Sequence, residues 1–186
     1  MSDSSSEDLL PTFWNPGIGK YHQAVRIPVT TPTRYLSYLA ALNLRLPGED
    51  TGDWHGDLPF VTYIDNPRTL KPAGPGGWSD TTPSLGSKGV RDMAHVLEGL
   101  YIPPGSGPVW VANHYRAIAD YVLVDTQGCW CAEFPRHVPV HNINQWLFAP
   151  EHVEHLVEEY LKPLRNQLTP EEKELHDAWL PTVVFG

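Results

Sequence analysis

The chain lacks any long hydrophobic run. No segment approaches the ~20 consecutive apolar residues that a membrane span needs, and the first residues do not show the basic and then apolar pattern of a secretory signal. Its two cysteines, Cys129 and Cys131, are too few and too close for the disulfide framework of a small secreted domain. We therefore expect no membrane association and predict a cytoplasmic protein.

Positive charge is also scarce. The 186 residues include 13 Lys and Arg against 22 Asp and Glu, a formal net charge of −9, and no basic run is present. Nucleic-acid-binding domains need a basic patch to hold the phosphate backbone, so no direct nucleic-acid binding is expected. Residues 151–180 concentrate the negative charge, with eight acidic and three basic side chains.

Common catalytic and cofactor motifs are missing. There is no GxGxxG or GxxxxGK[ST] loop, no GxSxG elbow, no HExxH and no EF-hand loop, which disfavours nucleotide binding, serine hydrolysis and metalloprotease chemistry. No cofactor is expected apart from a zinc ion discussed below.

The apolar content, in contrast, is sufficient for a folded core. Hydrophobic residues make up 41% of the chain and seven are Trp, and this length suits one domain better than two. We predict a flexible acidic and Ser-rich tail at residues 1–11. Residues 12–186 should form one mainly helical domain with minor short strands, and residues 150–180 its acidic helical part.

The segment Pro108–Asp125 is predicted to be the central buried helix. Its apolar residues recur at helical spacing and cover most of its surface. Only Asn113, Arg116 and Asp120 form a narrow polar line, at i, i+3 and i+7.

The remaining elements follow from turn residues and periodicity. Strands are expected at 24–29 and 60–64, and helices at 31–42, 88–100, around Trp146, from Pro150 with a kink at Pro163, and from the Thr169 capping box to Leu180. Residues 66–87 are rich in Pro and Gly and predict either a lid or a disordered loop.

The polar line of the central helix is the first candidate site. Arg116 and Asp120 could pair at i, i+4. In one interpretation they open onto a cleft in which Arg116 binds an anion and Asp120 orients it or His114. In the other they are buried and satisfy loop backbone groups.

Two further clusters suggest metal chemistry. Asp53, His55 and Asp57 would share one face of an extended segment, and His114 or His95 could complete a catalytic metal site. The alternative is an Asx-turn cluster.

Cys129, Cys131, His137 and His141 could form a tetrahedral zinc site, although C-x-C is tighter than the usual spacing. The alternative is two half-buried thiols beside surface histidines.

Three functions are compatible with these patterns. The leading hypothesis is a non-enzymatic partner-binding protein of the bacterial antitoxin, immunity or accessory-subunit type. It would offer an acidic helical surface to a protein with a basic surface, through Glu154, Glu158 and Glu159, and aromatic loops through Trp78. The second is a small metal-dependent hydrolase that uses the Asp53 cluster and Arg116. The third is a small module that binds an anionic ligand, with residues 66–87 as its lid. The oligomeric state does not follow from the sequence.

Overall fold

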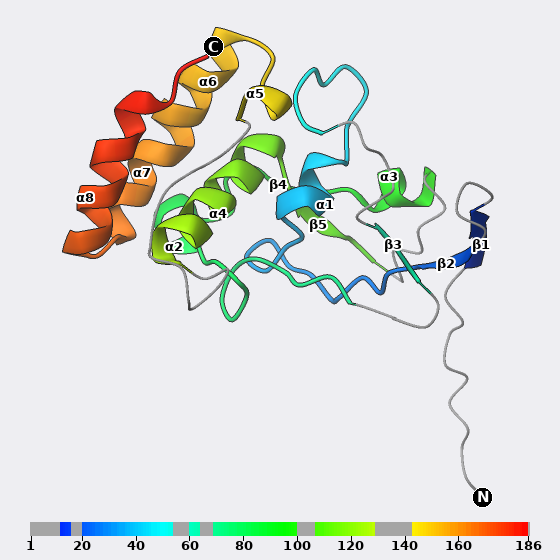
Figure 1. The fold of residues 1–186 in the computed structure, drawn as a ribbon. Coiled ribbons are helices and arrows are strands. Elements are labelled where there is room, and N and C mark those ends of the chain that lie inside the picture. Colours follow the sequence, from blue (N-terminus) through cyan, green and yellow to red (C-terminus); the bar gives the residue numbers. More distant parts are fainter. Residues whose placement is uncertain are drawn as a thin grey trace, which may run out of the picture.

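The computed structural model describes residues 12–15, 20–53, 60–63, 69–99, 107–128 and 143–185. This part of the chain is mainly helical, as predicted (Figure 1). Its α-helices are α1 (Tyr38–Leu42), α2 (Thr82–Leu85), α3 (Ala94–Gly99), α4 (His114–Gln127), α5 (Ile143–Trp146), α6 (Pro150–Leu156), α7 (Lys162–Leu164) and α8 (Pro170–Trp179).

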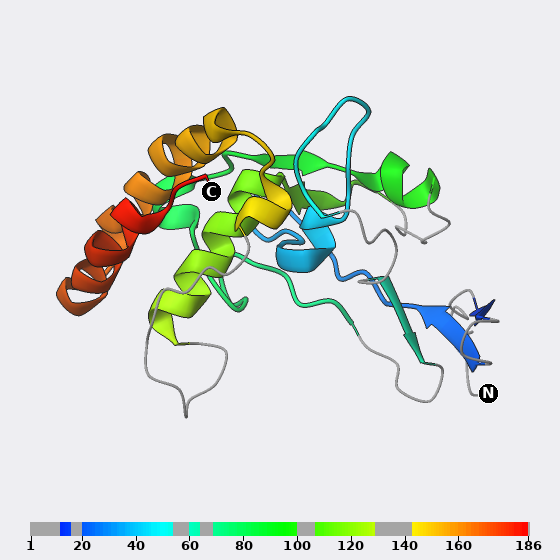
Figure 2. The ribbon, with the colours of Figure 1, turned by 45° about the horizontal axis from the view of Figure 1, so that its top comes forward.

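Two small antiparallel sheets complete the described fold. One has the strand order β1 (Thr12–Asn15), β2 (Lys20–Ala24) and β3 (Val61–Tyr63), and the other pairs β4 (Val90–Asp92) with β5 (Trp110–Ala112). The three-stranded sheet lies at the opposite end of the molecule from α6, α7 and α8 (Figures 1 and 2). Helix α4 lies between α1 and the C-terminal helices and contacts α1 and α8.

The predicted central helix begins later than its apolar pattern indicated. Trp110–Ala112 is the strand β5, and the helix starts only at His114, after Asn113 caps it by accepting a hydrogen bond from the Arg116 N–H at 2.8 Å. The backbone of β5 is bound both by β4 and by Leu36, whose N–H donates to the Trp110 carbonyl at 2.9 Å. A run that is apolar on every side fits a buried strand as well as a buried helix, so periodicity could not separate the two.

Backbone pairing also shortens two other predicted helices. Residues 31–36 form a turn closed between Thr31 and Arg34, and Tyr35 then exchanges backbone hydrogen bonds with Ala73. Only Tyr38–Leu42 of the predicted helix 31–42 is α-helical. Residues 90–92 of the predicted helix 88–100 pair with β5, which leaves the helix to begin at residue 94.

The strand predicted at 60–64 is confirmed as β3, whereas the one predicted at 24–29 is displaced towards the N-terminus as β2. A helical turn around Trp146 and the capping box at Thr169 are both present. Residues 69–87, part of the region predicted to be a lid or a disordered loop, form an irregular run that ends in α2.

The long C-terminal helix, predicted to kink at Pro163, has a π-helical turn at Val157–Leu161 just before that residue. Proline has no N–H to donate to the carbonyl four residues earlier, which belongs to Glu159. The Lys88 ammonium donates to this carbonyl instead, at 2.9 Å. The turn is therefore attached to the segment that precedes β4.

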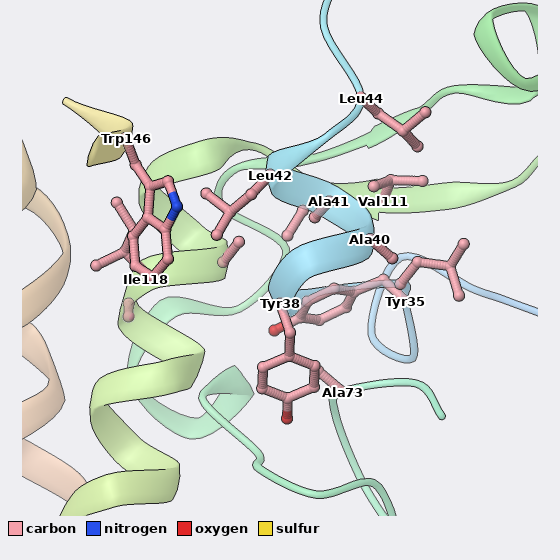
Figure 3. Close-up of a cluster of buried hydrophobic side chains, with 14 of the residues drawn as sticks. Tyr35, Tyr38, Ala40, Ala41, Leu42, Leu44, Ala73, Val111, Ile118 and Trp146 are labelled. Carbon is pink, nitrogen blue, oxygen red and sulfur yellow. The ribbon is translucent and has the colours of Figure 1, made fainter. Parts of the chain in front are cut away.

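One part of the hydrophobic core lies between α1, α4, α5 and α6, and the same cluster continues to α2, α3, β5 and α7. Leu42 and Ile118 are fully buried, and Leu42 points from α1 towards α4 and Trp146 (Figure 3). Tyr38 stands at the other end of α1, with its hydroxyl directed away from that helix (Figure 3). The two ends of α1 thus have different surroundings, and the end at Tyr38 borders the site described next.

Candidate functional site

The Arg116 side chain lies at the centre of a buried polar network. It is fully buried, and its Nε–H is shared between the Tyr35 hydroxyl at 2.9 Å and Thr81 Oγ1 at 2.7 Å. Its Nη1 donates to the Lys88 carbonyl at 2.7 Å, and its Nη2 donates to the Gly86 carbonyl at 3.2 Å. All three guanidinium nitrogens therefore bind protein atoms.

Asp120, which is also fully buried, is the hydrogen-bond acceptor of the same network. Its Oδ1 accepts from the Tyr35 hydroxyl at 3.1 Å and from Thr81 Oγ1 at 2.5 Å, and its Oδ2 accepts from Ser37 Oγ at 2.5 Å. Arg116 Nε lies 3.7 Å from Oδ1. Burial raises the pKa of Asp120, while the Arg116 charge and the three hydroxyl donors oppose that rise.

The predicted polar line therefore faces the interior of the protein. An anion could reach Arg116 only by displacing hydrogen bonds that hold residues 35, 81, 86 and 88 onto α4. Asn113 completes the line as the helix cap, and its Nδ2 also donates to the Tyr160 hydroxyl at 3.0 Å. This geometry fits the structural interpretation of the line, in which charged side chains satisfy backbone groups and one another.

His114 is equally enclosed. Its Nε2 lies 3.0 Å from the Leu44 carbonyl and its Nδ1 lies 2.6 Å from Thr51 Oγ1. A carbonyl can only accept, so Nε2 carries the proton and Nδ1 accepts from the Thr51 hydroxyl. Gly52 packs so closely that a Cβ there would lie 2.6 Å from His114 Cε1. The ring thus fixes the start of the loop that leads to Asp53.

Stability should fall in mild acid because of His114 and His176. Both are buried, and burial lowers the pKa of each below its ordinary value of 6.5. Below that pH the unfolded chain binds protons that the folded chain does not, so the stability present above pH 6.5 is lost as the pH falls. The loss is at most about 1.4 kcal/mol per pH unit for each group.

Urea unfolding between pH 7.5 and 5 measures this slope. His114→Gln and His176→Gln should each reduce it, whereas His95→Gln, at an exposed position on α3, should leave it unchanged. A slope that persists at full size in the double variant His114→Gln/His176→Gln would contradict the assignment.

The structure tests little of the predicted metal chemistry. Asp53 is half-buried, and its N–H donates to the Leu42 carbonyl at 2.7 Å. Both ring nitrogens of His114 bind protein atoms, as described above. The remaining members of the two predicted clusters lie outside the described residues, namely His55, Asp57, Cys129, Cys131, His137 and His141. Among the residues that the structure does describe, no three His, Cys, Asp or Glu side chains are placed to hold a metal ion.

The predicted partner-binding residues lie at the surface. Glu154 is exposed on α6, but Glu158 forms an ion pair with Lys162, and Glu159 forms one with Lys88 at 2.5 Å. These pairs balance part of the negative charge expected of the acidic helix. Trp78 is 42% exposed.

Trp78 belongs to a pocket that the sequence did not reveal. The pocket has a volume of about 450 Å³ and lies between the start of α1, the segment 69–71, Trp78 and helix α4. Most of the side chains that line it are apolar or aromatic: Leu36, Ser37, Tyr38, Leu39, Ala40, Thr69, Leu70, Lys71, Trp78 and Tyr121.

Tyr38 is the central side chain of this pocket. Its ring contacts Trp78 with a centroid distance of 5.6 Å and Tyr121 with one of 5.2 Å, and its hydroxyl lies 2.7 Å from Ser79 Oγ. The backbone of Tyr38 has φ +58°, a left-handed conformation that aromatic residues rarely adopt. Such positions are retained where the surroundings enforce them, and they are frequent at functional sites.

The tyrosine hydroxyls of the pocket are poor acids. Burial raises the pKa of Tyr121 to about 12, with the charges of Asp125 and Asp53 acting in the same direction. Burial and the Asp120 charge also raise the pKa of Tyr38. Both groups are therefore protonated at neutral pH and can act as hydrogen-bond donors but not as bases.

The pocket could not be found from local patterns, because its walls come from separate parts of the chain. Residues 36–40 belong to the predicted helix 31–42, and Trp78 to the irregular segment predicted at 66–87. The backbone hydrogen bonds between Tyr35 and Ala73 and the contacts of Tyr38 with Trp78 and Ser79 bring these two segments together.

Comparison with known proteins gives no further guide to the site. No family model, no curated protein and no solved structure matches the chain. Of the helices in the described residues, none is long and apolar enough to cross a membrane.

Proposed function

We propose that this chain is a non-enzymatic partner-binding protein whose pocket between α1 and Trp78 receives an apolar side chain of another protein. The observation that carries the proposal is the exposed rim of the pocket. Leu39 and Trp78, both large and apolar, are 47% and 42% exposed there. Large apolar side chains around a concave site are typical of protein-interaction surfaces.

The chemistry of the pocket supports binding rather than catalysis. Its hydroxyls belong to Tyr38 and Tyr121, which remain protonated, and to Ser37 and Thr69. The Ser37 hydroxyl donates a hydrogen bond to Asp120. None of these hydroxyls is therefore set up to accept a proton at neutral pH as a general base does.

The acidic helices have a different role in this proposal. Glu154 and the other exposed carboxylates of α6 and α8 would attract a partner with a basic surface. Charges at the edge of an interface mainly raise the association rate, whereas buried apolar anchors supply most of the affinity. Antitoxins, immunity proteins and accessory subunits are the classes of binding protein that fit this combination.

A photo-crosslinking amino acid placed at position 39 tests the proposal in cells of the native host. We expect it to form an adduct with a defined protein, and we expect Trp78→Ala in the same chain to reduce that adduct at least tenfold. The matched control is the same amino acid at Val184, which is 66% exposed and does not line the pocket. It should not form this adduct. Equal capture from both positions, or no protein adduct at position 39, would contradict the proposal.

A further inference from the structure

We infer that the partner segment that enters the pocket carries an aromatic side chain with an Asp or Glu beside it, and that this carboxylate binds Lys71. The inference rests on the proposed function and specifies the partner's chemistry. Two features of the pocket support it, namely the arrangement of its rings and the distribution of charge around it.

The rings favour an aromatic anchor. The planes of Tyr38 and Trp78 meet at 56° and those of Tyr38 and Tyr121 at 70°, so the walls present both ring faces and ring edges. Tyr121 is held in turn by stacking on Trp146, at 5.7 Å and 11°. A flat ring entering this space can make edge-to-face contacts with fixed neighbours, which stabilise a complex beyond the apolar area that is buried.

The charge distribution favours a carboxylate at one end of the pocket. Lys71 is the only charged side chain among the described lining residues, and its Nζ lies 5.2 Å from the centre of the Trp78 ring. Asp120 lies behind the pocket wall, where Arg116 and three hydroxyls compensate its charge.

The Lys71 ammonium beside Trp78 therefore attracts a carboxylate to that part of the pocket. A carboxylate bound there lies next to the side chain that enters among the rings, which sets the composition of the partner segment.

Three blocked peptides test the inference: acetyl-Glu-Phe-Glu-amide, acetyl-Lys-Phe-Lys-amide and acetyl-Glu-Ala-Glu-amide. Binding is followed by NMR through the shift of the Trp78 indole N–H, which Trp78→Phe assigns. We expect the Glu-Phe-Glu peptide to bind at least tenfold more tightly than either of the others at low salt. Lys71→Glu should reverse the preference between the Glu and Lys peptides. Lys173→Glu, which makes the same change of charge on α8 away from the pocket, should not.

Each other outcome has a distinct meaning. Equal binding of the two Phe peptides, unaffected by Lys71→Glu, would overturn the carboxylate preference and leave the proposed function standing. Equal binding of the Ala and Phe peptides would overturn the aromatic anchor. If 3-phenylpropionate shifts the Trp78 signal and no peptide does, the pocket belongs to a small aromatic acid. Both the inference and the proposed function would then be wrong.

Discussion

Arg116→Ala is expected to lower the free energy of unfolding by about 3–5 kcal/mol, the cost of breaking a buried ion pair on one side. The change leaves the fully buried Asp120 carboxylate without its counter-charge, and it leaves the Lys88 and Gly86 carbonyls without their donors. The free energy of unfolding of a small domain is about 5–15 kcal/mol in total. The variant would therefore lose a large part of its stability. Urea unfolding at pH 7.5 measures the loss.

Two comparisons show whether this loss belongs to the buried pair. Arg165→Ala removes an exposed pair with Asp177 and should have a far smaller effect. Arg116→Met/Asp120→Leu removes both charges together and should be less destabilised than Arg116→Ala, because no lone charge remains. The loss in Arg116→Ala should also shrink in acid, where Asp120 can take up a proton. A loss below about 1 kcal/mol in Arg116→Ala, typical of an exposed ion pair, would contradict the network described above.

Gly74→Ala should also be strongly destabilising and should remove the pocket. Gly74 has φ +95°, and a Cβ there would lie 2.0 Å from the Thr33 carbonyl oxygen, a backbone atom that cannot turn aside. The left-handed backbone costs about 1–2 kcal/mol for a residue with a Cβ, and the overlap adds about 1–3 kcal/mol. Since Ala73 is bound to Tyr35 in the same turn, the overlap pushes the segment 69–79 away from α1.

Gly76→Ala is the matched control for this prediction. Gly76 also has a positive φ, +74°, but a Cβ there would meet nothing within 4 Å. It should therefore show only the backbone cost. Thermal unfolding compares the stability of the two variants, and the Trp78 indole N–H signal reports on the pocket, which should be disturbed only in Gly74→Ala. Equal effects of the two substitutions on both measurements would contradict this account.

The sequence predicted an element of the fold correctly where the residues that determine the element lie within it. The Thr169 capping box acts on its own turn of helix and was located correctly. The pattern at 108–125 showed that the segment is buried, but it could not show that Trp110–Ala112 pairs with β4 and Leu36. Strand pairing depends on partners elsewhere in the chain, and a fully apolar run does not indicate which segments those are.

The candidate site was likewise predictable only where neighbouring residues in the sequence determine it. The sequence identified Arg116 and Asp120 as a pair and Trp78 as an exposed aromatic residue. It could not place Tyr38 beside Trp78, because that contact depends on the turn at Gly74 and on a left-handed Tyr38. Neither conformation is encoded by hydrophobic periodicity.

The hydrogen bond between Ser37 and Asp120 should lower the entropic cost of binding a partner. Ser37 lines the pocket and is also tied to the ion pair behind it, so this part of the wall is held by the interior of the protein. Ordering loops and side chains is a major cost when two proteins associate. In a preorganised wall that entropy has already been lost on folding. The pocket should therefore keep its shape without a partner, and binding should be governed by the partner's own ordering and by the release of water.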